Sequence, residues 1–311
     1  MFLPIGDAPN PRGVPWVTWG LIALNVFVYV GLLPATGKRP LPSDPRVAHY
    51  VRTLDEVYGR ELALQVAAQV TVYDLIVFEH GFKPQAPELL DLFASMFLHG
   101  GMIHLLGNML FLWIFGNNVE ARAGPGWFLA GYLLAGVLAA LGDAVLRMGS
   151  PLPAVGASGA ISGVLGAYYL LFPGNVVRVA VFLFPFVLDV WELRARLVLG
   201  FYVLVQNLLP ALIAAGEGGV SYGAHLGGFV AGLGLAWLVP RDPSGEAGAE
   251  GRFEALLEAG YALAQAGRPV EAYQHAFAAW NQATTRDSRD RAAELMRRLQ
   301  TEVRVPRRYL L

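Results

Sequence analysis

The sequence predicts an all-α, polytopic membrane protein with six transmembrane helices followed by a small cytosolic helical segment. Of its 311 residues, 55% are hydrophobic and only 15% are charged. The mean hydropathy of +0.46 is too apolar for a soluble chain of this length. Runs of about 20 residues with little or no charge recur along the chain, and that length crosses roughly 30 Å of hydrocarbon.

Six runs meet this criterion. The predicted spans cover residues 16–35, 101–119, 127–146, 155–172, 196–215 and 220–239. Residues 1–15 lack the basic head and the small-residue cleavage site of a signal peptide, so we expect a cytosolic N-terminal tail before a transmembrane domain over residues 16–240. The fourth span is stopped by Pro173 and Gly174, which cannot continue a helix.

Two connections between the spans carry amphipathic sequence. Residues 36–95 contain apolar segments too short to cross a bilayer, and these are expected to lie along its interface. In residues 174–194, Pro185, Asp189 and Glu192 divide an apolar run. We interpret that stretch as an interfacial loop, with a seventh span as the alternative.

The distribution of arginine predicts which way the chain crosses the membrane. With the N-terminus inside, the only arginine in the short outer segments is Arg147. The short inner segments then hold Arg12, Arg122, Arg178, Arg194, Arg196 and Arg241. Six spans return the C-terminus to the cytoplasm. The net charge of −1 argues against a nucleic-acid partner, and the absence of cysteine excludes disulfides and thiolate catalysis.

In this topology, spans two, four and six all start at the outer face and carry polar residues in or just before their first turns. These residues are His99, His104 and Asn108 for span two, Ser158 for span four and His225 for span six. Polar groups inside a membrane are costly and usually mark a site. Any one of them alone could simply bond a neighbouring helix, but their common depth favours a shared functional site.

The stretch PAVGASGAISGVLG, residues 153–166, places Ser158 at the start of the short fourth span. Fifteen residues from Ser158 make a helix of about 22 Å, so its N-terminus is expected below the outer surface, beside protein or water. The free N–H groups there favour an oxyanion. Gly156 and Gly159 allow close backbone approach. Gly159 with Gly163 predicts a small-residue face, which Gly228 with Gly232 repeats in the sixth span.

Together these residues resemble the rhomboid family of intramembrane serine proteases over residues 16–240. The matching motifs are GASG at 156–159, HGGMIHLLGN at 99–108, EARAG at 120–124 and AHLGGFVAG at 224–232. The resemblance implies the six-helix rhomboid fold. It also implies that Ser158 is the nucleophile and His225 its general base and acid, a dyad without an orienting carboxylate. By the same resemblance, His104, Asn108 and the Ser158 backbone N–H form the oxyanion hole.

Other matched positions are expected to support the site. His99 would stabilise the loop and the cavity entrance, and Ser221 would cap the sixth span. Rhomboids often carry an aromatic residue four positions after the nucleophile, packed on the catalytic histidine. Ser162 stands there instead; we expect it to pack, with a part in the hydrogen bonding of the site as the alternative. In the family, the fifth span and the loop before the sixth, here about 216–222, are thought to gate access. The structural turn motif consists of Glu120, Arg122 and Gly124.

The sequence lacks the complete catalytic motifs of the other two classes of intramembrane protease, the zinc and the aspartyl proteases. Zinc intramembrane proteases need HExxH, and the nearest fragment, EHGF at 79–82, lacks the second histidine. For an aspartyl protease, Tyr73 and Asp74 lie outside any span, and Asp143 in ALGD is interpreted as a helix-end residue. No metal or cofactor is expected. The predicted activity is cleavage of transmembrane segments of other proteins near the outer face. The alternatives are a non-catalytic rhomboid-like protein that binds membrane clients and, with less support, a transporter.

The expected location is the bilayer of a cell membrane, with a bacterial inner membrane as the specific prediction. After residue 240 the composition changes to a Gly-rich linker, 241–251, and a helical cytosolic region, 252–311. Part of this region resembles one tetratricopeptide hairpin, with Gly267 in the turn and Ala272 and Ala276 at close-packing positions. One repeat is too few for a stacked solenoid. A plain helical tail, self-association and a cytosolic protein partner therefore stay open, and His275 is expected to be a surface or packing residue.

Overall fold

The computed structural model describes residues 2–11, 13–41, 43–183, 187–213, 220–239, 243–283 and 285–302. The chain divides into two compact units, Met1–Val239 and Pro240–Leu311. The glycines at 216, 218 and 219, expected in the gating loop, lie outside the described residues. Arg12 and Arg241 lie outside them as well.

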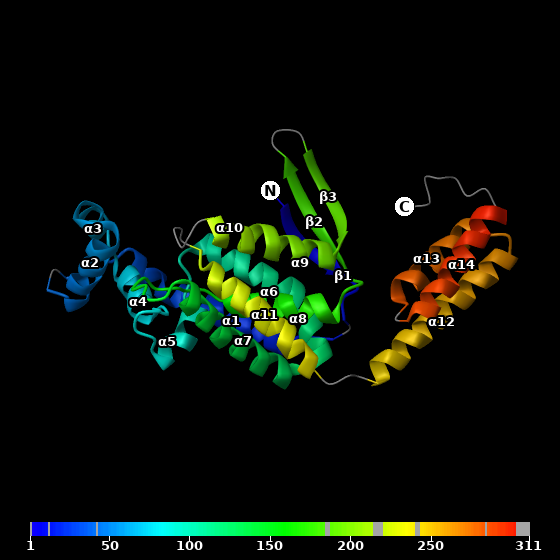
Figure 1. Cartoon of the computed structure of the whole chain (residues 1–311), viewed down its shortest axis with the longest axis horizontal. Helices are drawn as coiled ribbons and strands as arrows, with labels where there is room; N and C mark the ends of the chain where they lie inside the picture. The colour runs from blue at the N-terminus through cyan, green and yellow to red at the C-terminus, as the bar shows by residue number, and fades with distance from the viewer. Residues whose placement is uncertain are drawn as a thin grey trace. The chain divides into compact units, whose positions relative to one another are not determined.

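The first unit is built on helices at the positions of the predicted spans (Figure 1). They are α1 (Trp16–Thr36), α6 (Met102–Ala123), α7 (Pro125–Leu146), α8 (Ser158–Leu171), the continuous α9 (Ala195–Val203), η2 (Leu204–Leu208) and α10 (Leu209–Ile213), and α11 (Tyr222–Leu238). Among the described residues, four helical segments are long and apolar enough to cross a membrane: α1, α6, α7 and Ala195–Ile213. The predicted polytopic, mainly helical membrane fold is confirmed.

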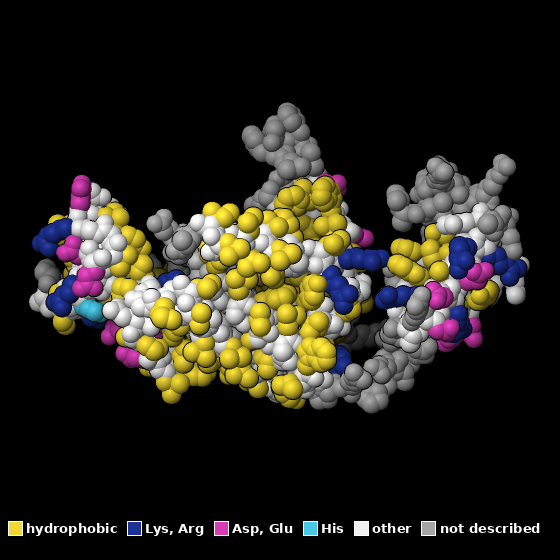
Figure 2. Space-filling model, in the orientation of Figure 1, with side chains coloured by type: hydrophobic (Ala, Val, Ile, Leu, Met, Phe, Trp, Pro, Cys, Tyr) yellow, Lys and Arg dark blue, Asp and Glu magenta, His cyan; other side chains and the backbone are white. Residues whose placement is uncertain are grey.

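Large apolar side chains cover much of the outer surface of these helices (Figure 2). Trp16, Phe27, Ile103, Val145 and Trp237 are all more than two-thirds exposed. A soluble protein rarely leaves so many large apolar side chains in contact with water. This surface is therefore suited to contact with the hydrocarbon chains of a lipid bilayer.

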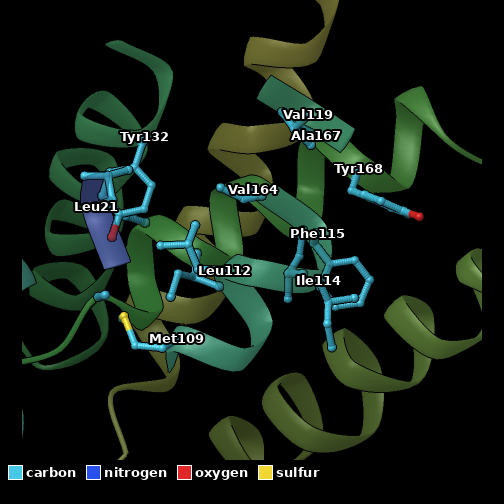
Figure 3. Close-up of a cluster of buried hydrophobic side chains, with 14 of the residues drawn as sticks. Leu21, Met109, Leu112, Ile114, Phe115, Val119, Tyr132, Val164, Ala167 and Tyr168 are labelled. Carbon is cyan, nitrogen blue, oxygen red and sulfur yellow. The ribbon is translucent and has the colours of Figure 1, made fainter. Parts of the chain in front are cut away.

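The core of the unit lies where α6, α7 and α8 meet (Figure 3). Leu112, Phe115, Val164 and Tyr168 are almost completely buried there. On the other side of α8, a Cβ placed on Gly228 of α11 would lie 2.1 Å from the Gly159 carbonyl oxygen. The small-residue faces expected on these two helices therefore lie against each other, backbone to backbone.

The turn between α6 and α7 explains the EARAG motif. The Glu120 carboxylate accepts hydrogen bonds from the Val17 N–H (2.9 Å), the Thr18 N–H (2.7 Å) and the Thr18 hydroxyl (2.7 Å). It thereby caps α1, which has no side-chain cap of its own. Gly124 has φ +83°, a left-handed value that favours glycine, and joins the two helices. Arg122 lies in the last turn of α6.

A three-stranded antiparallel sheet corrects two predictions. Its strands are β1 (Phe2–Ala8), β2 (Val176–Leu183) and β3 (Val187–Arg194), in the order β1-β2-β3. The prediction of a plain N-terminal tail is therefore wrong, because its residues 2–8 form strand β1. Residues 174–194 contain the paired strands β2 and β3 instead of an irregular loop or a seventh helical span. In β2, Val177, Val179 and Val181 alternate inward and are buried. The pairing strand β1 is about 170 residues away, so no local pattern shows the sheet.

Asp7 links β1 to the helices α6 and α8 through hydrogen bonds. Its Oδ2 accepts hydrogen bonds from Asn118 Nδ2 (2.7 Å) and from the Tyr168 hydroxyl (2.5 Å), which also accepts one from Asn175 Nδ2 (2.9 Å). The carboxyl is 2% exposed. Burial disfavours its charged form and raises the pKa of Asp7 from 3.8 to about 6, against the lowering effect of hydrogen bonding by Tyr168 and Asn175.

The long connection between α1 and α6 folds into short helices. They are α2 (Pro45–Tyr58), α3 (Arg60–Ala67), α4 (Val72–His80), α5 (Leu89–Ala94) and the single turn η1 (Ser95–Phe97). Asp74 forms a capping box with Thr71 at the start of α4. Tyr73 packs edge-on against Tyr29 of α1, with ring centroids 6.4 Å apart. The connection is therefore a folded part of the first unit.

The second unit consists of α12 (Pro243–Gln265), α13 (Pro269–Gln282) and α14 (Arg286–Glu302). Because α12 starts at Pro243, most of the predicted linker 241–251 is helical; proline suits the first turn, and the Glu and Ala residues after it favour a helix. Gly267 (φ +73°) makes the turn after α12. Ala272 and Ala276 are fully buried in the apolar core, and His275 is partly buried, bonded to the Glu271 carbonyl. The likeness to a tetratricopeptide hairpin stays a prediction.

Candidate active site

Ser158 begins α8, directly after an extended stretch that is bonded to the rest of the protein. Phe82 and Ala154 exchange two backbone hydrogen bonds of 2.9 and 2.8 Å, and the Gly156 N–H donates to the Ser95 carbonyl at 2.8 Å. The non-helical backbone expected before Ser158 is therefore satisfied by protein. This anchoring fixes where α8 begins.

Ser158 and His225 lie within hydrogen-bonding distance, although 67 residues separate them. The Ser158 Oγ is 2.9 Å from His225 Nε2. The close glycine packing of α8 on α11 brings the two side chains together, because each lies in the first turn or so of its helix. A hydroxyl bonded to an imidazole is the arrangement that activates a serine nucleophile.

His104 and Asn108 converge beside Gly156. A Cβ placed on Gly156 would lie 2.8 Å from His104 Nε2 and 3.5 Å from Asn108 Nδ2. Gly156 also has φ +121°, so both its backbone and its neighbours exclude a side chain. The buried Asn108 Nδ2 has no partner within the described structure. A long contact of 3.4 Å from the Gly100 N–H to His104 Nδ1 favours a hydrogen on Nε2. Two donors thus face one point near Ser158.

His99 supports this pair from behind. Its ring is completely buried and meets the His104 ring edge-on, with centroids 5.2 Å apart. The Tyr73 hydroxyl donates to the His99 carbonyl oxygen. His99 therefore packs under the loop and touches the site at His104.

The second ring nitrogen of His225 has a partner that the sequence did not reveal. Asn207 Oδ1 lies 2.7 Å from His225 Nδ1. The Tyr202 ring lies against the imidazole at a centroid distance of 6.3 Å, and its hydroxyl is 2.8 Å from Ser162 Oγ. The expected pair of Ser158 and His225 is therefore joined by Asn207, and Tyr202 of the fifth span supplies the aromatic contact that position 162 lacks.

Two other expectations about this region change. Ser162 does more than pack, because it bonds Tyr202. Ser221 occupies the position before α11 but makes no capping hydrogen bond with its side chain. An Asn in an apolar span, 18 residues before the histidine, was the only sequence signal for Asn207, and the side chain could not be placed without the path of the helix.

A cavity of about 950 Å³ opens over the site. Ser158, His225, His104, Asn108 and Tyr202 contribute to its wall. Its volume is enough for water and for several residues of an extended peptide. Hydrolysis in a membrane requires such a space, because the hydrocarbon itself holds no water to reach the serine.

Residues weighed for rival chemistries have structural partners. Asp143 is completely buried in α7 and pairs with Arg147 at 2.5 Å. Across the described parts of the chain, no group of three or more His, Cys, Asp or Glu residues is placed to hold a metal ion. The fold and site thus define a helical membrane protein with a serine–histidine pair beside a cavity.

Comparison with known proteins gives the family. Residues 86–242 match the family model described as "Rhomboid domain", and the chain belongs to the rhomboid family. Rhomboid protein 1, mitochondrial, of Saccharomyces cerevisiae is 33% identical over 163 residues, 51% of this chain and 44% of that protein. Rhomboid-like protein 11, chloroplastic, of Arabidopsis thaliana is 31% identical over 164 residues, 49% and 52% of the two chains.

A bacterial relative is also similar. Rhomboid protease GluP of Bacillus subtilis is 46% identical over 76 residues, 24% of this chain and 14% of its own. The chain thus spans about half or less of the length of these relatives. Family membership indicates an intramembrane protease or a rhomboid-like protein in a membrane. The prediction of a bacterial inner membrane gains no support from these relatives. One is named for mitochondria, one for chloroplasts, and one is bacterial.

Proposed function

We propose that this protein is an intramembrane serine endopeptidase. The observation that carries the proposal is the 2.9 Å contact between Ser158 Oγ and His225 Nε2 at the wall of the cavity. A packing role alone would not require a hydroxyl, an imidazole and two converging donors at one point. The relative GluP is named a rhomboid protease, which supports the same assignment.

In this proposal His225 Nε2 takes the proton of Ser158 as the Oγ attacks a peptide carbonyl carbon. The carbonyl oxygen becomes an oxyanion, which accepts hydrogen bonds from His104 Nε2, Asn108 Nδ2 and the Ser158 N–H at the helix start. His225 then gives its proton to the leaving amine, and an ester to Ser158 remains. Water from the cavity hydrolyses that ester by the same proton transfers in reverse roles.

The substrates follow from the position of the site. The bond must reach Ser158 in extended form, because a helical peptide group is already hydrogen-bonded and its carbon is shielded. Transmembrane segments of other proteins with small, helix-weakening residues near the outer face fit this requirement. The lipid bilayer is the medium through which they arrive. Both chain termini are assigned to the cytoplasm by the arginine distribution.

Labelling with a serine-directed fluorophosphonate tests the proposal. Wild-type protein in detergent micelles or liposomes is expected to take the label, and Ser158→Ala to take none. Ser162→Ala is the matched control: Ser162 is completely buried one turn further along the same helix, and its loss should leave Ser158 labelled. Folded wild-type protein that takes no label would instead favour a client-binding protein without catalysis.

A further inference from the structure

The fifth span reaches the catalytic histidine through two side chains. Tyr202 lies in α9 and Asn207 in the π-helical segment η2. Residues five apart point about 140° away from each other around an α-helix, so an unbroken helix could present only one of the two to His225. The π turn, in which the Leu209 N–H bonds to the Leu204 carbonyl, brings positions five apart back to one side.

Pro210 gives a local reason for the irregular helix. It has no N–H to offer to the Gln206 carbonyl, and its ring crowds that carbonyl in a regular α-helix. Helices relax such conflicts by widening a turn. In this span the widened turn directs the Asn207 side chain toward the protein interior, where Asn207 is 2% exposed. Its neighbour Gln206 is exposed.

The hydrogen bonds of Asn207 determine which end of its amide faces His225. Nδ2 donates to the Tyr202 carbonyl oxygen at 2.8 Å, and a carbonyl can only accept. Oδ1 must therefore be the atom 2.7 Å from His225 Nδ1. Because an amide oxygen can only accept, Nδ1 must carry a hydrogen. In a neutral imidazole Nε2 is then the unprotonated nitrogen, and it is the one that faces Ser158.

We propose that Asn207 is a positioning residue that holds His225 in the Nδ1–H tautomer, so that Nε2 is free to take the proton of Ser158. This inference rests on the proposed protease function. Asn207 touches neither the nucleophile nor the substrate and acts only through the histidine. Asn207 and Tyr202 both belong to the fifth span, so these two contacts orient the base while that span lies against α11.

The first test reads the tautomer directly. In ¹⁵N-histidine-labelled wild-type protein in liposomes, the neutral His225 signal, assigned by its loss in His225→Gln, should be that of the Nδ1–H form. In Asn207→Leu, which keeps the volume and removes the acceptor, the Nε2–H form should appear. A wild-type histidine in the Nε2–H form would overturn the proposal without any variant.

The second test is kinetic. Cleavage of a fluorogenic transmembrane peptide by Asn207→Leu should show kcat lowered about 10- to 100-fold with KM changed less than about 3-fold, because only the transition state uses the oriented base. Asn207→Ala serves if the leucine variant fails to fold. Gln206→Leu is the matched control, the same change of an amide at the exposed neighbouring position, and should cleave as wild type. Unchanged kcat in folded Asn207→Leu would refute the positioning role. Failure of the protease proposal itself is distinguishable, because then wild type would neither cleave nor take the fluorophosphonate.

Discussion

Replacing Gly228 with alanine tests whether the close packing of α8 and α11 makes the active site. The added Cβ would lie 2.1 Å from the Gly159 carbonyl oxygen, which belongs to the residue directly after Ser158. Such an atom needs at least 3.0 Å. Because both partners are helical backbone, a side-chain rotation cannot relieve the overlap, and the two helices must separate by about 1 Å.

The separation acts directly on the catalytic pair. Ser158 lies at the start of α8 and His225 on α11, and their contact of 2.9 Å would lengthen towards 4 Å, beyond a hydrogen bond. A misplacement of about 1 Å costs about 100-fold in rate. The overpacking itself destabilises by about 1 to 3 kcal/mol, offset by about 1 kcal/mol from the better helix propensity of alanine. The cleavage rate should therefore fall about 100-fold, while the net loss of stability, about 0 to 2 kcal/mol, leaves the protein folded.

The assay is cleavage of a fluorogenic transmembrane peptide in liposomes, with thermal unfolding measured alongside. Gly234→Ala is the control on the same helix, since within the described residues nothing beyond its own chain neighbours and helix backbone lies within 4 Å of the Cβ it would add. That variant should keep full activity and equal or greater stability. If Gly228→Ala cleaves as fast as Gly234→Ala, the helix contact does not set the catalytic geometry and this reasoning is refuted.

Three further changes test other parts of the structure. Glu120→Ala would leave buried N–H groups of α1 without acceptors and should lower stability by about 2 to 4 kcal/mol, measured by thermal unfolding, with Glu120→Gln losing less. The pKa of Asp7 is raised to about 6 in the fold, so its favourable contribution is present below about pH 4 and is lost as pH rises through 6. The protection factors of the β1 amides, which divide out the intrinsic pH dependence of exchange, should therefore be lower at pH 8 than at pH 5, and this difference should disappear in Asp7→Asn. Tyr202→Phe keeps the ring against the histidine and loses the bond to Ser162, so kcat should fall less than about 5-fold, whereas Tyr202→Ala should fall further. A Tyr202→Phe loss as large as that of Tyr202→Ala would assign the effect to the hydroxyl.

The helical part of the fold could be predicted because hydrocarbon imposes a length and a composition on every span. The fourth span is an example. Its short length indicated that the helix start, with Ser158, lies below the membrane surface, and its glycines indicated a closely packed neighbouring helix. The sheet could not be predicted, because β1 and β2 are about 170 residues apart in the sequence and each alone is only a short apolar segment.

The site divides in the same way. The sequence alone identified Ser158, His104 and His225 as site residues, because polar groups inside a membrane are costly and usually mark a site. The predicted topology then placed all three at a similar depth. Asn207 could not be placed, since its direction depends on the π turn near Pro210, and helical periodicity assumes a regular helix. Tyr202 was missed for another reason: an aromatic residue in a span is ordinary, and only the contact with His225 makes it part of the site.

The central claim is that Ser158 and His225 form the catalytic pair of an intramembrane protease. The most direct measurement is the cleavage rate of a transmembrane peptide by wild-type, Ser158→Ala and His225→Ala proteins in liposomes. The account predicts cleavage by wild type and a loss of about 1,000-fold or more in each variant, with no further loss when the two are combined. Cleavage by His225→Ala at the wild-type rate would contradict it.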